Sequence, residues 1–339
     1  IRNAPLMASM ASGVICCISD FRAQSLANTS WSYAVLQVYD KPLMDSIAAC
    51  ALKIIGEASP TSCSQRQTCS SVLDAIGLAW ALEFLLCLDD GLFAAIRDLC
   101  LRCGRHIDGI TFRDAGADSV AGVPPRAPAL GQVAPTILTH LPGMLVVFKP
   151  PGWEVDGHAS RRGVGAEGHD GRLGLSSFLQ SRFDRGACPL CYWSSFDFGF
   201  LHRLDIPSSG LVLVGSTMQG YWSLRLQLNT YRLAREYVVV CQGLVPGQLS
   251  KISLGIGSAA SMVGKSVVDE CGRPAETHAK ALVHLSFPWS CSVSTSLAAI
   301  RIRTGRHHQI RTHMLNADCP IVTDGKYTLR TLLLQTGVA

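Results

Sequence analysis

His202-Arg203-Leu204-Asp205, followed by the turn Ile206-Pro207-Ser208-Ser209-Gly210 and the apolar run Leu211-Val-Leu-Val-Gly215, is the stretch that decides the fold of the second half of this chain. The apolar run predicts a buried strand, and the turn before it carries an aspartate beside an arginine. A carboxylate in such a place is partly desolvated and can act as a nucleophile or a base. Capping of the turn is the commoner role of an aspartate. These residues alone leave both interpretations open.

The region around this stretch contains further short runs of β-forming residues. Val, Ile and Leu dominate residues 144–148, 211–215, 237–241, 277–285 and 297–302, and Gly or Pro turns bound several of these runs. Helical patterns intervene at 175–182 and 307–315. Together they predict an α+β fold with a mostly antiparallel mixed sheet and flanking helices.

Three further segments carry polar residues beside these runs. They are Lys149-Pro150-Pro151-Gly152, Arg235-Glu236-Tyr237, and Thr304-Gly305-Arg306-His307-His308-Gln309-Ile310-Arg311-Thr312-His313, which Pro320-Ile-Val-Thr-Asp324-Gly-Lys-Tyr327 follows. In this order and spacing, together with residues 202–210, the set strongly resembles the RluA-type pseudouridine synthases. The resemblance covers about residues 137–327.

The resemblance implies a reaction and three catalytic residues. The family isomerises uridine in RNA, rRNA or tRNA, to pseudouridine without a metal or an organic cofactor. Asp205 matches the catalytic aspartate, which either attacks the ribose C1′ or promotes cleavage through a glycal; the sequence does not choose. Tyr237 matches a tyrosine that stacks on the flipped base and is a candidate for removing the C5 proton. Arg311 matches an arginine that pairs with the catalytic carboxylate.

Further positions match residues that contact the substrate. Arg203 matches the arginine thought to fill the gap left by the flipped nucleotide, and a planar guanidinium suits that place. The full set of expected substrate-binding residues is Arg203, His202, Arg306, His308, Gln309 and Lys149. The three histidines 307, 308 and 313 do not share one helix face, so no metal site is expected there.

Several positions depart from the family pattern. Ser208 stands where Thr is usual, Phe148 replaces a frequent Asn, His307 replaces Thr or Ser, and Thr323 replaces the Gly before Asp324. After Tyr327 the chain is short, so the last strand of the catalytic sheet is expected to be truncated. A non-catalytic RNA-binding protein that keeps the fold is therefore the alternative function, and a helical scaffold for a protein partner is a weaker one.

Charge and hydropathy narrow the class of protein. Of the formal net charge of +5 over 339 residues, residues 1–136 contribute −2 and residues 137–339 contribute +7. A basic half indicates a polyanion partner such as RNA, although ordinary surface charge would give the same number. The longest apolar stretch, residues 72–88, contains Asp74 and Glu83 and is too short to cross a bilayer comfortably, so no membrane association is expected.

The first hundred residues predict helical hairpins. At an offset of 49 residues the chain matches itself at Trp31/Trp80, Leu36/Leu85, Asp40/Asp89, Leu43/Leu92 and Ile47/Ile96. The pattern resembles the helical repeats of organellar RNA-binding proteins. A plain helical extension with coincidental spacing is the alternative. Deletion of residues 1–115 is expected to leave the chemistry intact and to reduce discrimination between RNAs.

These patterns divide the chain into a helical segment (1–114), a Gly/Pro-rich linker (115–136) and a catalytic domain (137–339). The GxGxxG string at 163–168 lacks the strand and helix of a nucleotide site, so it is interpreted as a loop. The scattered cysteines, including Cys188 and Cys191, are interpreted as reduced thiols in an intracellular compartment. The sequence, which starts at Ile1, does not distinguish an organelle (mitochondrion or plastid) from the cytoplasm or nucleus. A monomer is expected.

Overall fold

The computed structural model describes residues 3–58, 64–114, 133–156, 173–258, 264–286 and 294–327. The chain forms two compact units, Ile1–Arg232 and Leu233–Ala339. The GxGxxG string, the end of the chain after Tyr327 and most of the predicted linker lie outside the described residues. The predicted domain boundary in that linker therefore stays a prediction.

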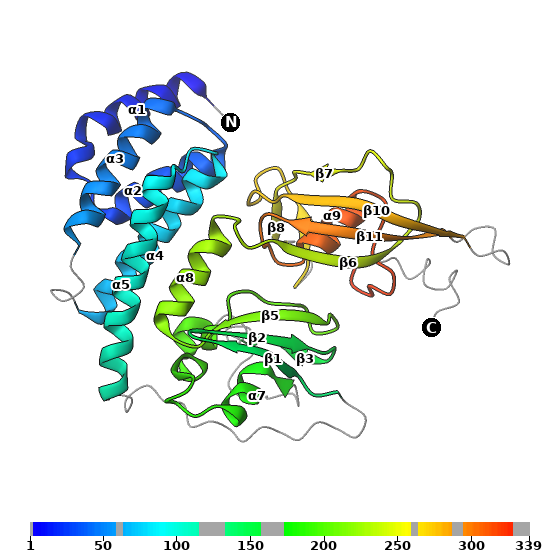
Figure 1. Ribbon diagram of the computed structural model, residues 1–339. Helices are drawn as coiled ribbons and strands as arrows, with labels where there is room; N and C mark the ends of the chain where they lie inside the picture. The colour runs from blue at the N-terminus through cyan, green and yellow to red at the C-terminus, as the bar shows by residue number, and fades with distance from the viewer. Residues whose placement is uncertain are drawn as a thin grey trace. The chain divides into compact units, whose positions relative to one another are not determined.

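The first unit begins with a single helix, which two helical hairpins follow. The helices are α1 (Ala4–Cys17), α2 (Ala23–Leu36), α3 (Lys41–Glu57), α4 (Gln65–Phe84) and α5 (Asp90–Asp114), with a short 3₁₀ turn η1 (Ile18–Asp20) after α1. Helix α2 packs along α4, and α3 packs against α5 (Figure 1). Equivalent helices of the two hairpins therefore stack on one another, as in a helical repeat.

The two hairpins share their capping interactions residue by residue. The Asp40 carboxylate accepts the N–H of Leu43 at 3.0 Å, and Asp89, 49 residues later, accepts that of Leu92 at 2.8 Å. Both first helices end on a left-handed residue, Gln37 and Leu86. The next N–H returns to the helix in both copies, from Val38 to the Tyr33 carbonyl and from Cys87 to that of Leu82, each at 2.9 Å. The repeat predicted from the sequence is confirmed, because the same Asp cap and the same helix end recur.

A three-stranded antiparallel sheet follows the helices and contains the strand after His202-Arg203-Leu204-Asp205. Its order is β1 (Thr136–Leu141), β2 (Met144–Lys149) and β5 (Gly210–Gly215). The short strands β3 (Trp153–Glu154) and β4 (Leu173–Gly174), helix α7 (Leu175–Arg182) and the 3₁₀ segments η3 (Pro189–Tyr192) and η4 (Ser194–Gly199) complete this part. Alternate residues of β2 and β5, including Leu145 and Val212, are fully buried. The apolar run at 211–214 therefore forms the strand that the sequence predicts, with burial alternating along it.

Helix α8 (Met218–Asn229) joins this sheet to the helical hairpins. It packs on β5 and also on α4 and α5 (Figure 1), and Trp222 on it is fully buried. The Asp108 carboxylate of α5 accepts the N–H groups of Met218 and Gln219, at 2.8 and 3.1 Å. A Cβ atom on Gly104 would lie 2.4 Å from the Gln219 Cα, so the helices touch through backbone. The helical hairpins and the three-stranded sheet are thus packed together within one compact unit.

The second unit is a four-stranded antiparallel sheet covered by a helix. The order is β6 (Arg235–Gln242), β11 (Ser294–Ile302), β10 (Thr277–Ser286) and β7 (Lys251–Ile252), and α9 (Gln309–Asn316) packs against β10. Strands β8 (Ile256–Ser258) and β9 (Ser266–Val268) form a separate pair, and β9 also contacts α9. The core includes Cys241, Ala298, Ile300 and Met314. The predicted antiparallel α+β architecture is confirmed.

Two expectations about cysteines and membranes have outcomes in the structure. Cys188 and Cys191 form a disulfide, so their interpretation as reduced thiols was wrong, whereas Cys100 and Cys103 are buried thiols. Two cysteines three residues apart reach one another because a 3₁₀ turn starts between them.

Among the described residues no helix combines the length and hydropathy that a membrane span needs. In the same ranges no cluster of three or more His, Cys, Asp or Glu side chains could hold a metal ion.

Candidate active site

Asp205 lies on the turn that leads into β5. The Asp205 carbonyl accepts the N–H of Ser208 at 3.0 Å, and the next carbonyl, of Ile206, accepts the N–H of Gly152 at 2.8 Å. The Asp205 side chain is half-buried. The turn is therefore held by its own backbone and by the Lys149-Pro150-Pro151-Gly152 segment, which brings two of the sequence motifs together.

The Lys149 side chain holds this turn through hydrogen bonds to its backbone. It ends β2 and is fully buried, and its Nζ donates to the carbonyls of Ser208 (2.6 Å), Pro150 (3.1 Å) and Ile206 (3.2 Å). Burial lowers the pKa of Lys149 to about 8, against the opposing effect of the Asp205 carboxylate. An ammonium group has three N–H donors, and backbone carbonyls take all three. These contacts favour positioning of the Asp205 turn over direct RNA binding by Lys149.

We expect Lys149→Met to cut turnover of RNA on the order of 100-fold and to lower the free energy of unfolding by about 2–3 kcal/mol, because it removes all three hydrogen bonds that the ammonium group makes to the turn. Lys280→Met is the matched control, since Lys280 is exposed on β10. Single-turnover rates and urea unfolding of both variants measure the effect. Equal rates for the two variants would contradict the positioning role.

His202 and Arg203 precede the turn and face different surroundings. His202 is half-buried, and its Nε2 accepts the N–H of Leu213 on β5 at 3.3 Å. Arg203 is exposed. His202 thus attaches the segment to the sheet. An exposed guanidinium two residues before Asp205 is available to RNA, as the resemblance implies, and this role stays a prediction.

Tyr237 belongs to the second unit. It lies on β6 opposite Ile300 of β11 and packs, partly buried, against the core. Arg235, at the start of the same strand, donates through Nη2 to the Arg303 carbonyl at 2.8 Å. The motif Arg235-Glu236-Tyr237 is therefore anchored to the strand end that leads into residues 304–313.

Arg311 on α9 makes a two-point ion pair with Asp324. Its Nε lies 2.7 Å from Asp324 Oδ2 and its Nη2 lies 2.5 Å from Oδ1, while the guanidinium covers the Tyr327 ring at 4.8 Å. Burial raises the pKa of Asp324, but the Arg311 pair and the N–H groups of Lys326 and Tyr327 outweigh it, and the pKa is lowered overall. Asp324 and Tyr327 thus hold Arg311. Neither residue is predicted from sequence to have a role, although both lie in the Pro320–Tyr327 motif.

His308 extends this cluster. It caps α9 in a left-handed conformation, and its Nδ1 lies 2.8 Å from the hydroxyl of buried Tyr327. The exposed His307 ring stacks on His308, with 3.7 Å between the ring centroids. His307 therefore adds an aromatic surface next to the Arg311 cluster, where the family pattern has a small hydroxyl residue.

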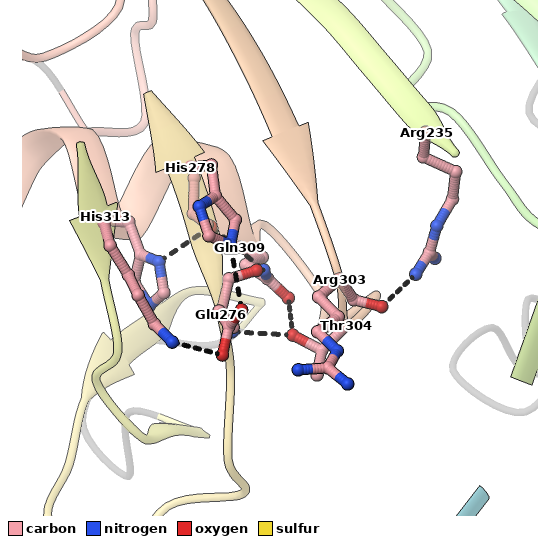
Figure 2. Close-up of polar contacts among 9 residues, drawn as sticks. Arg235, Glu276, His278, Arg303, Thr304, Gln309 and His313 are labelled. Carbon is pink, nitrogen blue, oxygen red and sulfur yellow. Dashed lines mark hydrogen bonds and ion pairs between the residues drawn. The ribbon is translucent and has the colours of Figure 1, made fainter. Parts of the chain in front are cut away.

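Gln309 and Arg306 bind protein groups. Gln309 is buried: its Oε1 accepts from the Thr304 hydroxyl (2.8 Å) and the Arg306 N–H (3.0 Å), and its Nε2 donates to the Glu276 carbonyl (2.9 Å). Figure 2 shows Gln309 between Thr304 and Glu276. The Arg306 side chain donates through Nε to the Pro274 carbonyl at 2.9 Å. These bonds favour a positioning role for Gln309, and the expected RNA contacts of Arg306 and His308 stay predictions.

Thr323 has a left-handed backbone, with φ at +61°. A β-branched residue is strained there, and the family pattern has Gly at this position. We expect Thr323→Gly to raise the free energy of unfolding by about 0.5–1 kcal/mol, the strain relieved less the added chain entropy. Thr323→Ala loses the branch but keeps the Cβ atom, so it should give a smaller gain. Urea unfolding of both variants decides the point, and an equal gain in the two would exclude backbone strain.

The predicted site residues fall into two groups, one in each unit. In the first unit the structure brings Lys149 to the turn of Asp205. In the second it links Arg311 and His308 through Tyr327. Asp205 belongs to Ile1–Arg232, and Tyr237 and Arg311 belong to Leu233–Ala339, so their convergence in one pocket stays a prediction.

Known proteins match the part of the chain that contains these motifs. The family model of RNA pseudouridylate synthases matches residues 143–316. Ribosomal large subunit pseudouridine synthase D of Neisseria meningitidis serogroup B is 36% identical over 130 residues, 38% of this chain and 33% of that protein. The synthase D of Buchnera aphidicola (subspecies Schizaphis graminum) is 30% identical over 189 residues, 54% of this chain and 51% of that protein. The chain thus spans a third to a half of the length of these relatives.

A solved structure, human RNA pseudouridylate synthase domain containing 1, aligns over 61% of this chain and 74% of its own, with a TM-score of 0.44 and 21% identity. The family match covers half of the chain and includes Lys149, Asp205, Tyr237 and Arg311. The chain belongs to the RNA pseudouridylate synthase family.

Proposed function

We propose that this chain is an RNA pseudouridine synthase that isomerises specific uridines in structured RNA, either rRNA or tRNA. The observation that supports it most is the Lys149 ammonium group, which is buried under the Asp205 turn and bonded to three carbonyls around it. Burial of a lysine is costly, and here it serves to fix the backbone beside one carboxylate. A buried lysine that fixes the backbone in this way is more typical of a turn that carries a reacting carboxylate than of an ordinary surface turn.

The proposed reaction needs no external reactant. The C1′–N1 bond of uridine breaks, the uracil turns, and a C1′–C5 bond forms; the proton on C5 leaves and N1 gains one. Asp205 either attacks C1′ or promotes cleavage through a glycal, and Tyr237 is the candidate for taking the C5 proton. The base must first leave its stack, at a cost of a few kcal/mol that contacts such as Arg203 offset. Arg311 would keep the reacting carboxylate ionised in the pocket.

A non-catalytic RNA-binding protein with this fold is the second candidate. The departures at His307 and Thr323 favour it, since they lie next to the Arg311 cluster. Such a protein would need the arginines but neither Asp205 nor the buried lysine that holds its turn. Retention of Asp205, Tyr237 and Arg311 together therefore favours the enzyme.

RNA is the proposed partner because the basic charge is concentrated in residues 137–339. We expect the logarithm of the RNA association constant to fall with the logarithm of salt concentration with a slope of about −3, equal to about four neutralised phosphates. Arg301→Gln, which removes an exposed arginine of β11, should reduce the magnitude of this slope by about one. Fluorescence anisotropy with a labelled hairpin RNA between 50 and 300 mM KCl measures both. A slope near zero would mean that the charge is only solvated surface. Because rRNA and tRNA lie inside cells and organelles, we also infer that the protein is intracellular.

The experiment that tests the proposal uses the full chain and unmodified transcripts of rRNA and tRNA. Digestion to nucleosides and chromatography then separate pseudouridine from uridine. Pseudouridine that accumulates with time supports the enzyme. RNA binding without any pseudouridine on the whole transcript set supports the binding protein instead.

A further inference from the structure

Four polar side chains are buried together between α9 and the start of β10. Thr277 and His313 are fully buried, and Thr304 and Gln309 are 3% exposed. Burial of this many polar groups is favourable only if each finds its partner. Figure 2 shows the cluster, with His313 and Gln309 from α9 approaching the segment that carries Glu276 and His278.

The hydrogen bonds fix the direction of every proton in the cluster. The Leu254 carbonyl lies 3.1 Å from His313 Nε2 and can only accept, so Nε2 carries the hydrogen. Thr277 Oγ1 lies 2.9 Å from His313 Nδ1 and also accepts a hydrogen bond from the side-chain amide Nε2 of Gln309 at 3.0 Å. The Thr277 hydroxyl hydrogen therefore points at Nδ1. His313 is neutral in this arrangement, with a lone pair on Nδ1 that accepts from Thr277.

A second proton on His313 would break this order. Nδ1–H would face the Thr277 oxygen, which would then accept two N–H groups while its own hydrogen lost its acceptor in a buried place. Burial lowers the pKa of His313 below its usual value, only partly opposed by the bond to Leu254, in keeping with this arrangement. The imidazole therefore stays neutral over most of the physiological range.

The charged groups nearby do not offset a charge on His313. On the elements packed around it and beside them these are Lys251, Lys265, Asp269, Glu276, His278, Lys280, His284, Arg303, Arg306, His307, His308, Arg311 and Asp324. Of the carboxylates, Glu276 already binds Lys251 (3.0 Å) and His278 (2.8 Å), and Asp324 already binds Arg311. Asp269 accepts the N–H of Cys271 at 2.9 Å. The structure gives none of these three carboxylates an ion pair with His313, so an imidazolium at this position would be buried without a counter-charge.

We propose that His313 is a positioning residue whose neutral ring ties α9 to β10 and to the Leu254 backbone, and so holds Arg311 in its pair with Asp324. The inference rests on the proposed synthase activity, because Arg311 matters there through the reacting carboxylate. Protonation of His313 releases this side of α9, so turnover falls on acidification. Because the pKa is lowered on folding, the stability that this ring contributes is complete above the ordinary histidine pKa of about 6.5 and is lost as pH falls through the lower value of the folded state.

Two substitutions with different chemistry test the proposal on the full chain. Thr277→Val keeps the shape but removes the hydroxyl, and we expect kcat at pH 7.5 to fall on the order of tenfold with KM for RNA unchanged, as for one lost buried hydrogen bond. Thr277→Ser keeps the hydroxyl and should restore kcat. A role in folding alone would lower the fraction of active enzyme and leave kcat per active site at the wild-type value, which would overturn the proposal.

His313→Gln gives the pH test. Glutamine can still donate to the Leu254 carbonyl and accept from Thr277, but it does not titrate. We expect wild-type kcat to decline as the pH falls below the ordinary histidine pKa of about 6.5, and His313→Gln to lack this decline. The same decline in both proteins would overturn the proposal.

Nuclear magnetic resonance of the imidazole nitrogens separates failure of this inference from failure of the proposed function. Absence of pseudouridine from wild-type reactions argues against the synthase. It does not change the expected spectrum, in which Nε2 is protonated and His313 titrates below about 6.5. Titration at or above that value, or the Nδ1–H tautomer at neutral pH, would overturn the positioning role of His313.

Discussion

Asp205→Asn is expected to abolish pseudouridine formation and to leave RNA affinity within about twofold of the wild type. The amide has nearly the shape of the carboxylate, so the turn held by Lys149 keeps its hydrogen bonds. It cannot act as a nucleophile toward C1′ or as a base, and a loss of at least 10⁴-fold, more than about 5 kcal/mol of transition-state stabilisation, is the scale expected for the reacting group. Single-turnover reactions with excess protein measure the rate.

Asp184→Asn is the matched control, because Asp184 is an exposed aspartate of the same unit whose carboxylate accepts the Ala187 N–H. It should react at the wild-type rate. Measurable turnover by Asp205→Asn would remove Asp205 from the chemistry. Loss of RNA binding along with turnover would show that the carboxylate serves the structure of the turn.

Gly104→Ala has the second large expected effect, on stability. The added Cβ would lie 2.4 Å from the Cα and 2.7 Å from the N of Gln219, which are backbone atoms that cannot step aside. Helices α5 and α8 must separate, and the Asp108 bonds to the start of α8 lengthen. We expect a loss of about 3 kcal/mol in the free energy of unfolding, in spite of the better helix propensity of alanine.

Gly109→Ala, five residues further along α5, is the control because its Cβ would meet nothing within 4 Å. Alanine should there stabilise by about 0.5–1 kcal/mol. Urea unfolding followed by circular dichroism compares the two. If Gly104→Ala were as stable as Gly109→Ala, the close packing of α5 on α8 would be contradicted.

The same interface changes what is expected of the helical segment. From sequence, deletion of residues 1–115 was predicted to spare the chemistry, since a Gly/Pro-rich linker follows. In the structure α5 covers α8, where Trp222 is fully buried, and removing α5 would expose this face. Loss of folded protein is therefore the expected result, and the part played by these helices in RNA selection is better tested by substitutions on their exposed faces.

Much of the fold could be predicted from the sequence because its signals are local. Asp40 and Asp89 each predict the start of a helix, and the apolar run at 211–214 predicts β5. The packing of α5 on α8 could not be predicted, because Gly104 and Asp108 act on a helix more than a hundred residues away and no local pattern points to it. Gly in a helix reads as a weak position until its neighbour is known.

The candidate site divides in the same way. Motif spacing predicts Asp205, Tyr237 and Arg311 as catalytic residues, because chemistry restricts which residue types can stand there, and these roles stay predictions. Lys149 and Gln309 were assigned to substrate, yet both are buried and bonded to protein groups. A lysine or glutamine in a motif has the same letters whether it faces RNA or backbone carbonyls. Only the fold decides which of these it meets.

The fate of the C5 hydrogen tests the central claim most directly. An RNA transcript made with uridine labelled with tritium at C5 releases the label to water when the C1′–C5 bond forms. We predict release with time by the full chain, to a level equal to the pseudouridine found in the same RNA, and none with Asp205→Asn. Binding of that RNA by the wild-type chain without any release of tritium, across rRNA and tRNA transcripts, would contradict the assignment of this protein as a pseudouridine synthase.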